Sequence, residues 1–232
     1  MNTFFKQLKW QFILLQKNNI ISISFGVTII YGLLLFFLKD VKYIDELLVS
    51  LVLNDPSVIG YFFIALFIYT EIKHGVLNAL FVTPVNAHKY LISKILALAI
   101  IGTICSIGLV LSVKGLNFDI FNYIVGSFSI CLLSSIIGLI TLTFASEFLN
   151  FALISVPVFF LFTGISLLSY LGAIDVGAFK YLLPVQGGLD LIDNAVSDTR
   201  INYGYVYISL SVAIPLFYVI AFRLFTKKFI SQ

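Results

Sequence analysis

The sequence predicts an all-helical membrane protein with six transmembrane helices in a single domain, residues 1–232. Hydrophobic residues make up 60% of the chain and charged residues only 11%, and the mean hydropathy is +1.08. Soluble domains carry about 25% charged residues, so this composition excludes that class. The uncharged runs reach about 20 residues, the length a helix needs to cross about 30 Å of hydrocarbon. They lack the alternation of barrel strands.

The first 18 residues predict an amphipathic helix that lies along the membrane surface. Four apolar residues recur at helical spacing, namely Phe5, Leu8, Phe12 and Leu15. Lysines supply the polar side, and Trp10 suits the headgroup level, where aromatic rings are enriched. The alternative is a basic tail without regular structure.

Six apolar runs then predict the transmembrane helices, over residues 20–38, 57–71, 91–113, 121–144, 150–172 and 203–222. The boundaries near 55–72 and 144–150 stay open, because the second run is short and only six residues separate the fourth from the fifth. The first run lacks a small-residue cleavage site, which favours a retained span over a signal peptide. Cys105 and Cys131 lie within runs, which argues against a disulfide framework.

The basic residues predict that both termini are cytoplasmic. In that orientation nine of the 14 Lys and Arg residues lie in cytoplasmic segments and five in external ones. Loops rich in Lys and Arg tend to stay on the cytoplasmic side. Of the 11 acidic residues only Glu71 and Glu147 fall inside, and Asp55 is counted among the external ones.

Residues 72–88, between the second and third spans, predict a short helix parallel to the membrane. An apolar stripe is formed by Val76, Leu77, Leu80 and Phe81. The Thr83–Pro84 step ends the helix, because proline disfavours helical geometry in the residue before it. Such a helix can fit a groove of a soluble partner and transmit its movement to two spans. The alternative is an ordinary polar loop.

One face of the fourth predicted span consists of small residues. They alternate in steps of four and three, as Ser127, Cys131, Ser134, Gly138, Thr141 and Ala145. Small residues allow close helix packing in lipid, so a tight seam within one subunit is one interpretation. The other is a wall of the substrate path.

No catalytic, cofactor or metal site is expected in the chain. It lacks the Gly-x-x-x-x-Gly-Lys-Ser/Thr phosphate loop, so ATP chemistry would lie on another polypeptide. The motifs Gly-x-Ser-x-Gly and His-Glu-x-x-His are missing as well. The histidines, His74 and His88, are interpreted as solvated loop residues. No carboxylate is expected at membrane depth that would serve a proton- or sodium-coupled carrier.

The order of residues around the 72–88 segment resembles the permease subunits of type-2 ABC exporters. An acid, Glu71, ends the second span, and the segment continues with His74-Gly75, an apolar helix with Leu77, Leu80 and Val82, Thr83-Pro84, Lys89-Tyr90 and a third span from about Lys94. Six spans, cytoplasmic termini and an N-terminal interfacial helix fit the same family. Val76 follows Gly75 where members often carry a small hydroxyl residue.

The resemblance implies a complex of two permease chains, this chain with a second copy or a paralogue, and two ATPase subunits that bind ATP and Mg²⁺. It makes residues 72–88 the coupling helix, with Glu71, His74, Gly75, Leu77, Leu80, Thr83, Pro84 and Lys89 as the ATPase-coupling residues. The expected location is the bacterial cytoplasmic membrane. Membrane lipids are expected as partners, and nucleic acid is not.

The segment 175–202, before the last span, is rich in apolar residues for an external loop. We interpret it as a re-entrant or interfacial helix pair, with Gly187-Gly188 as its turn. A comparable element caps the outer exit in the type-2 exporter family. The alternative is an ordinary surface loop.

These observations together predict the permease of an ATP-driven exporter that moves a hydrophobic or amphipathic substrate, such as a drug, a lipid or a small peptide. The scarcity of charge in the spans favours such substrates over ions and sugars. Two alternatives remain: a flippase for lipids or cell-wall precursors on the same scaffold, and a non-transporting immunity or sensor module.

Overall fold

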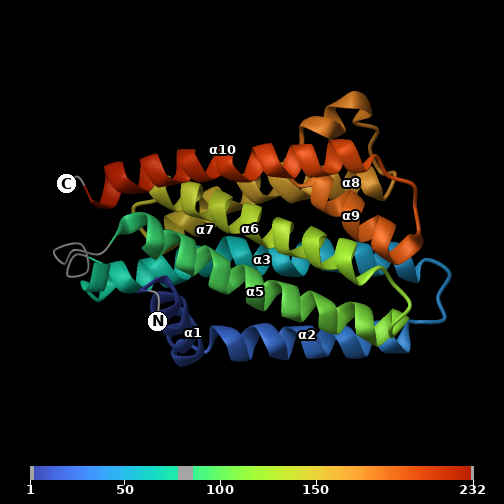
Figure 1. The fold of residues 1–232 in the computed structure, drawn as a ribbon, viewed down its shortest axis with the longest axis horizontal. Coiled ribbons are helices and arrows are strands. Elements are labelled where there is room, and N and C mark those ends of the chain that lie inside the picture. Colours follow the sequence, from blue (N-terminus) through green and yellow to red (C-terminus); the bar gives the residue numbers. More distant parts are fainter. Residues whose placement is uncertain (1–2, 78–85, 231–232) are drawn as a thin grey trace.

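The computed structural model describes residues 3–77 and 86–230, and in this part of the chain it is helical without β-strands. Figure 1 shows an elongated bundle whose long helices run side by side. In chain order its elements are α1 (Thr3–Lys17), α2 (Ile20–Phe37), α3 (Ile44–Lys73), α5 (Ala87–Lys114), α6 (Ile120–Phe144), α7 (Phe148–Phe159), a π-helical turn η1 (Phe160–Gly164), α8 (Ile165–Tyr170), a 3₁₀ helix η2 (Gly177–Leu182), α9 (Gln186–Ser197) and α10 (Tyr203–Phe229).

Among the described residues, six helical segments are long and apolar enough to cross a membrane, which confirms the predicted number of spans. They are α2, α3, α5, α6, the continuous stretch from α7 to α8, and α10. The open boundary near 144–150 is resolved by a break between α6 and α7. Within the fifth span, η1 follows Pro157 by three residues, in keeping with the tendency of helix irregularities to occur near proline.

The second span begins earlier than predicted, because α3 starts at Ile44 and has 30 residues. The Asp55–Pro56 step lies inside this helix, and Asp55 is buried at 6% exposure. Its assignment to the external side was therefore wrong, as was the expectation that no carboxylate would be buried within a span. A polar Asp-Pro pair resembles a helix boundary in sequence, whereas here neighbouring helices cover it.

The predicted N-terminal helix is α1, which is separate from α2. Asn19 adopts a left-handed backbone conformation (φ 59°) between them, and asparagine tolerates this better than most residues. Figure 1 shows α1 turned away from the axis of α2 at one end of the bundle. Leu15 is buried, whereas Phe5 and Trp10 are exposed.

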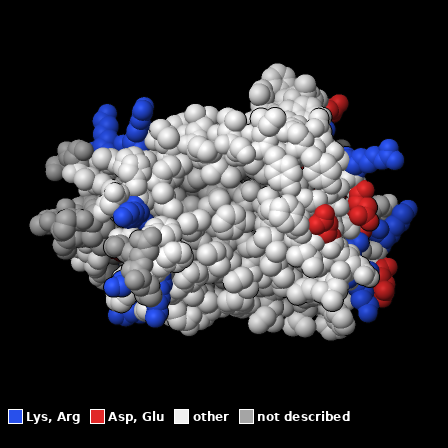
Figure 2. All heavy atoms as spheres, viewed as in Figure 1, with Lys and Arg blue, Asp and Glu red and all other residues white. Residues whose placement is uncertain are grey.

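We name the two ends of the bundle the α1 end and the α9 end. The α1 end also holds the end of α3, the beginning of α5 and the C-terminal part of α10 (Figure 1). On the face seen in Figure 2, acidic side chains gather at the α9 end, and the α1 end carries only basic ones. The charge asymmetry that the sequence predicted therefore coincides with the two ends of the fold.

The small residues of α6 form the tightest seam in the core, against α3 and α5. All six members of the predicted face are buried. A Cβ atom added to Gly138 would lie 2.3 Å from the backbone oxygen of Tyr61, and the Tyr61 hydroxyl donates to Thr141 Oγ1 at 2.9 Å. The Cys131 thiol lies against Gly102 of α5. This geometry favours the packing interpretation over a wall of the substrate path.

The structure of the 175–202 segment, at the α9 end, differs from the prediction in one detail. It does contain two helices, η2 and α9, but Gly187 and Gly188 lie in the first turn of α9 and do not form the turn between them. The chain reverses at Leu183–Val185 instead. Both glycines are buried, and a Cβ atom on Gly188 would lie 2.6 Å from Ile130 Cγ1 of α6. Their small size serves close packing of α9 on α6 and α10.

Candidate functional site

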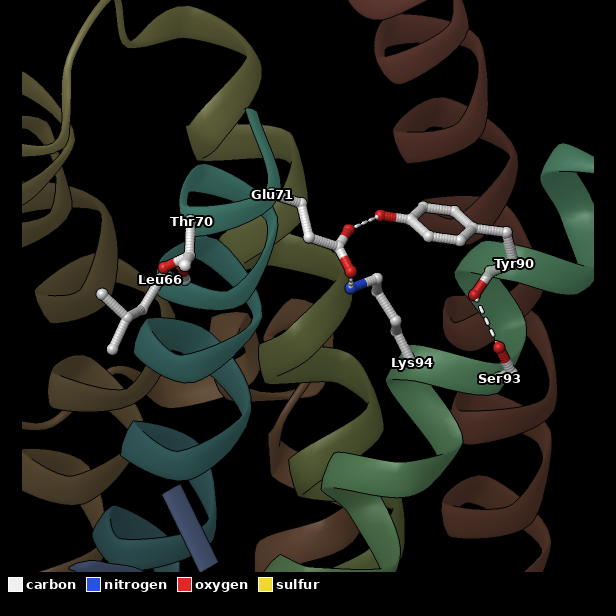
Figure 3. A network of polar contacts seen from close by, with 6 residues as sticks. All are labelled: Leu66, Thr70, Glu71, Tyr90, Ser93 and Lys94. Atoms are coloured by element: carbon white, nitrogen blue, oxygen red, sulfur yellow. Dashed lines mark hydrogen bonds and ion pairs between the residues drawn. The ribbon is translucent and has the colours of Figure 1, made fainter. Parts of the chain in front are cut away.

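A buried ion pair joins the end of α3 to the beginning of α5 at the α1 end. Lys94 Nζ lies 2.7 Å from Glu71 Oε1, and the Tyr90 hydroxyl donates a hydrogen bond to Glu71 Oε2. Figure 3 shows the Glu71 carboxylate between these two side chains of α5. Lys94 is fully buried, and its Nζ also lies 3.3 Å from the centroid of the Phe67 ring.

This network attaches the two helices that flank residues 74–86 to each other at the α1 end. Tyr90 and Lys94 are four residues apart, so they lie on the same face of α5 and both reach Glu71. A buried ion pair adds little net stability, but loss of one partner costs about 3–5 kcal/mol because the other charge stays buried. Glu71 and Lys94 thus hold α3 and α5 in one relative position.

The beginning of α5 is also attached to α10. The His88 ring stacks on Phe222, with centroids 3.5 Å apart and planes 13° apart, and His88 Nδ1 lies 3.1 Å from the Tyr218 hydroxyl. Two residues further along α5, Tyr90 lies beside Phe225 of α10. His88 was interpreted as a solvated loop residue: it is exposed, but it does not lie in a loop, because it belongs to α5 and packs on α10.

Gly75 forms the turn that ends α3. Its φ of +67° is a left-handed conformation, the usual role of glycine just after a helix, and its N–H bonds to the carbonyl of Ile72. His74 is exposed at the same turn. The predicted helix 72–88 therefore had wrong limits, because residues 72–73 belong to α3 and 87–88 to α5.

The other predicted coupling residues are placed as follows. Leu77 is buried at 2% exposure, whereas Val76 beside it is 46% exposed. The apolar group offered to a partner in the described part of this turn is therefore Val76. Lys89 is exposed in the first turn of α5, where Asn86 caps the helix by accepting from its N–H. Leu80, Thr83 and Pro84 lie outside the described residues.

Two members of the junction were not predicted as site residues, Tyr90 and Lys94. Lys89 was the basic residue predicted to take part in ATPase coupling, and Lys94 was interpreted only as the approximate start of the third span. The available signal was the position of Lys94, seven residues inside an apolar helix. A cation at such a depth needs an anionic partner, and Glu71 ends the preceding span.

In the described part of the chain, six helices long and apolar enough to cross a membrane define a multi-pass membrane protein. Within this class, residues 20–184 match the family described as "Fluoroquinolones export permease protein Rv2686c-like". The match runs from the start of α2 to just beyond η2, most of the chain, and the protein belongs to this family of export permeases. It is thus a transport component and not a catalytic subunit. No curated protein matches the chain.

Proposed function

We propose that this protein is the permease subunit of a type-2 ABC exporter and moves drugs of the fluoroquinolone class, or similar amphipathic molecules, out of the cytoplasm. Two permease chains would assemble with two ATPase subunits, which bind ATP and Mg²⁺. The family match is the observation that carries the substrate class. It also favours a drug over the lipid-flippase and sensor alternatives.

The geometry of the α1 end supports coupling to an ATPase. With the α1 end in the cytoplasm, as the excess of basic residues favours, the connection between α3 and α5 faces the ATPase. Glu71 and Lys94 link its two ends, and His88 links α5 to α10. A force applied to this connection would therefore move three spans as a unit.

Transport can be measured in inside-out membrane vesicles that contain the permease and its ATPase. We expect a fluorescent fluoroquinolone to accumulate in the vesicles when ATP and Mg²⁺ are added. Vesicles whose ATPase carries an inactivated phosphate-loop lysine are the control and should not accumulate it. Accumulation that is equal in both preparations would contradict an ATP-driven exporter, and ATP-dependent movement of a labelled lipid without the drug would support a flippase.

A further inference from the structure

A groove of about 430 Å³ opens at the α1 end between α1, the end of α3 and the beginning of α5. Its apolar walls include Leu14 of α1 and Phe67 of α3, and the exposed Trp10 and Val76 stand at its edge. The Glu71–Tyr90 contact forms part of its lining. An occupant of this groove would touch the junction between α3 and α5 directly.

The polar groups in the groove require two kinds of partner. Gln11 lines the groove and is 4% exposed, and its Oε1 has no hydrogen-bond partner among the described residues; because this oxygen is itself buried, it can accept from an occupant once the side chain turns toward the groove. A buried acceptor without a donor costs about as much as its desolvation, so an occupant with an O–H or N–H is favoured. At the rim lies Lys17, which is exposed and forms no ion pair within residues 3–77 and 86–230. The positive charge of Lys17 therefore favours an occupant with an anionic group.

Glu71 does not compete for that cation, because its carboxylate is already bound by Lys94 and Tyr90. His74, also at the rim, supplies a further hydrogen-bonding ring. The groove thus combines an apolar wall, an unsatisfied buried acceptor and a free cation. A phospholipid headgroup with an anionic phosphate and a hydroxyl group matches all three.

We infer that the groove binds one anionic phospholipid of the adjacent leaflet, of the phosphatidylglycerol type. Its phosphate lies near Lys17 and His74, a headgroup hydroxyl donates to Gln11, and its glycerol and upper acyl chains contact Leu14 and Phe67. Basic pockets between membrane helices on the cytoplasmic side bind such headgroups. The exposed Trp10 belongs at headgroup depth, which favours a lipid over a segment of a soluble protein.

The single tryptophan of the chain, Trp10, provides the measurement. The full-length permease is reconstituted in vesicles of phosphatidylcholine with increasing fractions of phosphatidylglycerol brominated on its upper acyl chains, which quenches nearby tryptophan. We expect quenching to saturate at a low fraction of brominated phosphatidylglycerol, and brominated phosphatidylcholine to quench only in proportion to its amount.

Lys17→Gln should weaken the preference for phosphatidylglycerol about fivefold, the effect expected for one basic residue at an anionic surface, and Gln11→Leu should weaken it while keeping the bulk of the side chain. Lys6→Gln is the matched control, because Lys6 is exposed on the same helix but does not line the groove. Circular dichroism checks that each variant is folded.

Equal quenching by the two brominated lipids would overturn the inference, as would an equal loss of preference in the Lys6 and Lys17 variants. Free glycerol phosphate that removes the quenching at a matched concentration would show a soluble anion as the ligand, and would also overturn it. The measurement needs neither ATPase nor drug, so its result is independent of whether the protein exports fluoroquinolones.

Discussion

Lys94 is the most deeply buried charged residue in the described chain. Its side chain is fully buried, and Glu71 is its ion-pair partner. The second salt bridge, between Lys114 and Asp45, has the same Nζ to oxygen distance of 2.7 Å, but its side chains are 24% and 32% exposed. The two pairs differ in burial rather than in geometry, and their replacement should have different effects.

Glu71→Gln should lower the free energy of unfolding by about 3–5 kcal/mol, because Lys94 then remains as a buried charge without its anion. Asp45→Asn should lower it by no more than about 1 kcal/mol. Denaturation of the purified permease in detergent measures both. Combining Glu71→Gln with Lys94→Gln should restore part of the loss. Equal effects of the Glu71 and Asp45 substitutions would contradict a buried, structurally required pair.

Gly75 offers a test of backbone conformation alone. A Cβ atom would meet nothing within 4 Å at Gly75 or at Gly26 of α2, but only Gly75 has a positive φ. We expect Gly75→Ala to lower the unfolding temperature, at a cost of about 1 kcal/mol, and Gly26→Ala to raise it, since alanine favours a helix by about 0.5–1 kcal/mol. Thermal unfolding should show opposite signs. A stabilising Gly75→Ala would contradict the left-handed turn.

At the scale of the elements, close contact between helices depends on glycines. A Cβ atom added at these positions would meet backbone atoms in one case and a side chain in another. The nearest atom to an added Cβ is the Tyr61 backbone oxygen at Gly138, on the seam between α6 and α3. At Gly188, where α9 meets α6, it is the Ile130 side chain. A side chain can change its conformation, whereas a helix backbone can yield only by moving the whole helix.

Gly138→Ala should therefore destabilise the bundle more than Gly188→Ala. Overpacking in a filled core typically costs about 1–3 kcal/mol, and we expect Gly138→Ala at or above the upper limit. Ile130→Ala should relieve the effect of Gly188→Ala, because it removes the nearest obstacle. Unfolding in detergent measures all three variants. If Ile130→Ala adds to the loss without any relief, α9 is not seated as described.

The six spans could be predicted because composition alone determines them. Helix limits, turns and contacts between helices were harder to predict, because each depends on a few residues. Runs of about 20 apolar residues identified all six spans, because the bilayer imposes that length. The start of α3 stayed open because Asp55 suggests water, and only its neighbours in three dimensions show that it is covered. Gly187-Gly188 suggested a turn because glycine permits one, but here the missing side chain permits contact between helices. Lys94 and Glu71 are 23 residues apart, and no local pattern pairs them.

On the scale of the whole molecule, charge and packing give the bundle two different ends and a filled core. On the face seen in Figure 2 the α1 end carries basic side chains, and the junction of α3 and α5 lies at the same end. The seam of α6 against α3 leaves no passage along its small residues. A drug path therefore fits better between two permease chains, as the proposed assembly requires, than along this seam of one chain.

Val76→Asp should weaken ATPase binding without unfolding the permease, because Val76 is exposed beside the turn at Gly75. Leu77→Asp should unfold the α1 end, since a charge at that buried position costs several kcal/mol. Co-purification of the ATPase and thermal unfolding of the permease separate the two effects. Lys73→Gln, also exposed, is the control and should change neither. Full ATPase binding by a folded Val76→Asp variant would show that this turn is not a contact.

Asp55 also has a consequence for how the chain enters the membrane during its synthesis. An aspartate near the centre of an isolated membrane helix opposes insertion by about 2.5–3.5 kcal/mol. In the finished bundle α3 packs mainly on α6 and α5, and the ribosome makes both after α3. The apolar residues of α3 have to offset this cost on their own until the later neighbours arrive and cover the carboxyl group. We therefore expect stable insertion of the second span to depend in part on synthesis of the third and fourth.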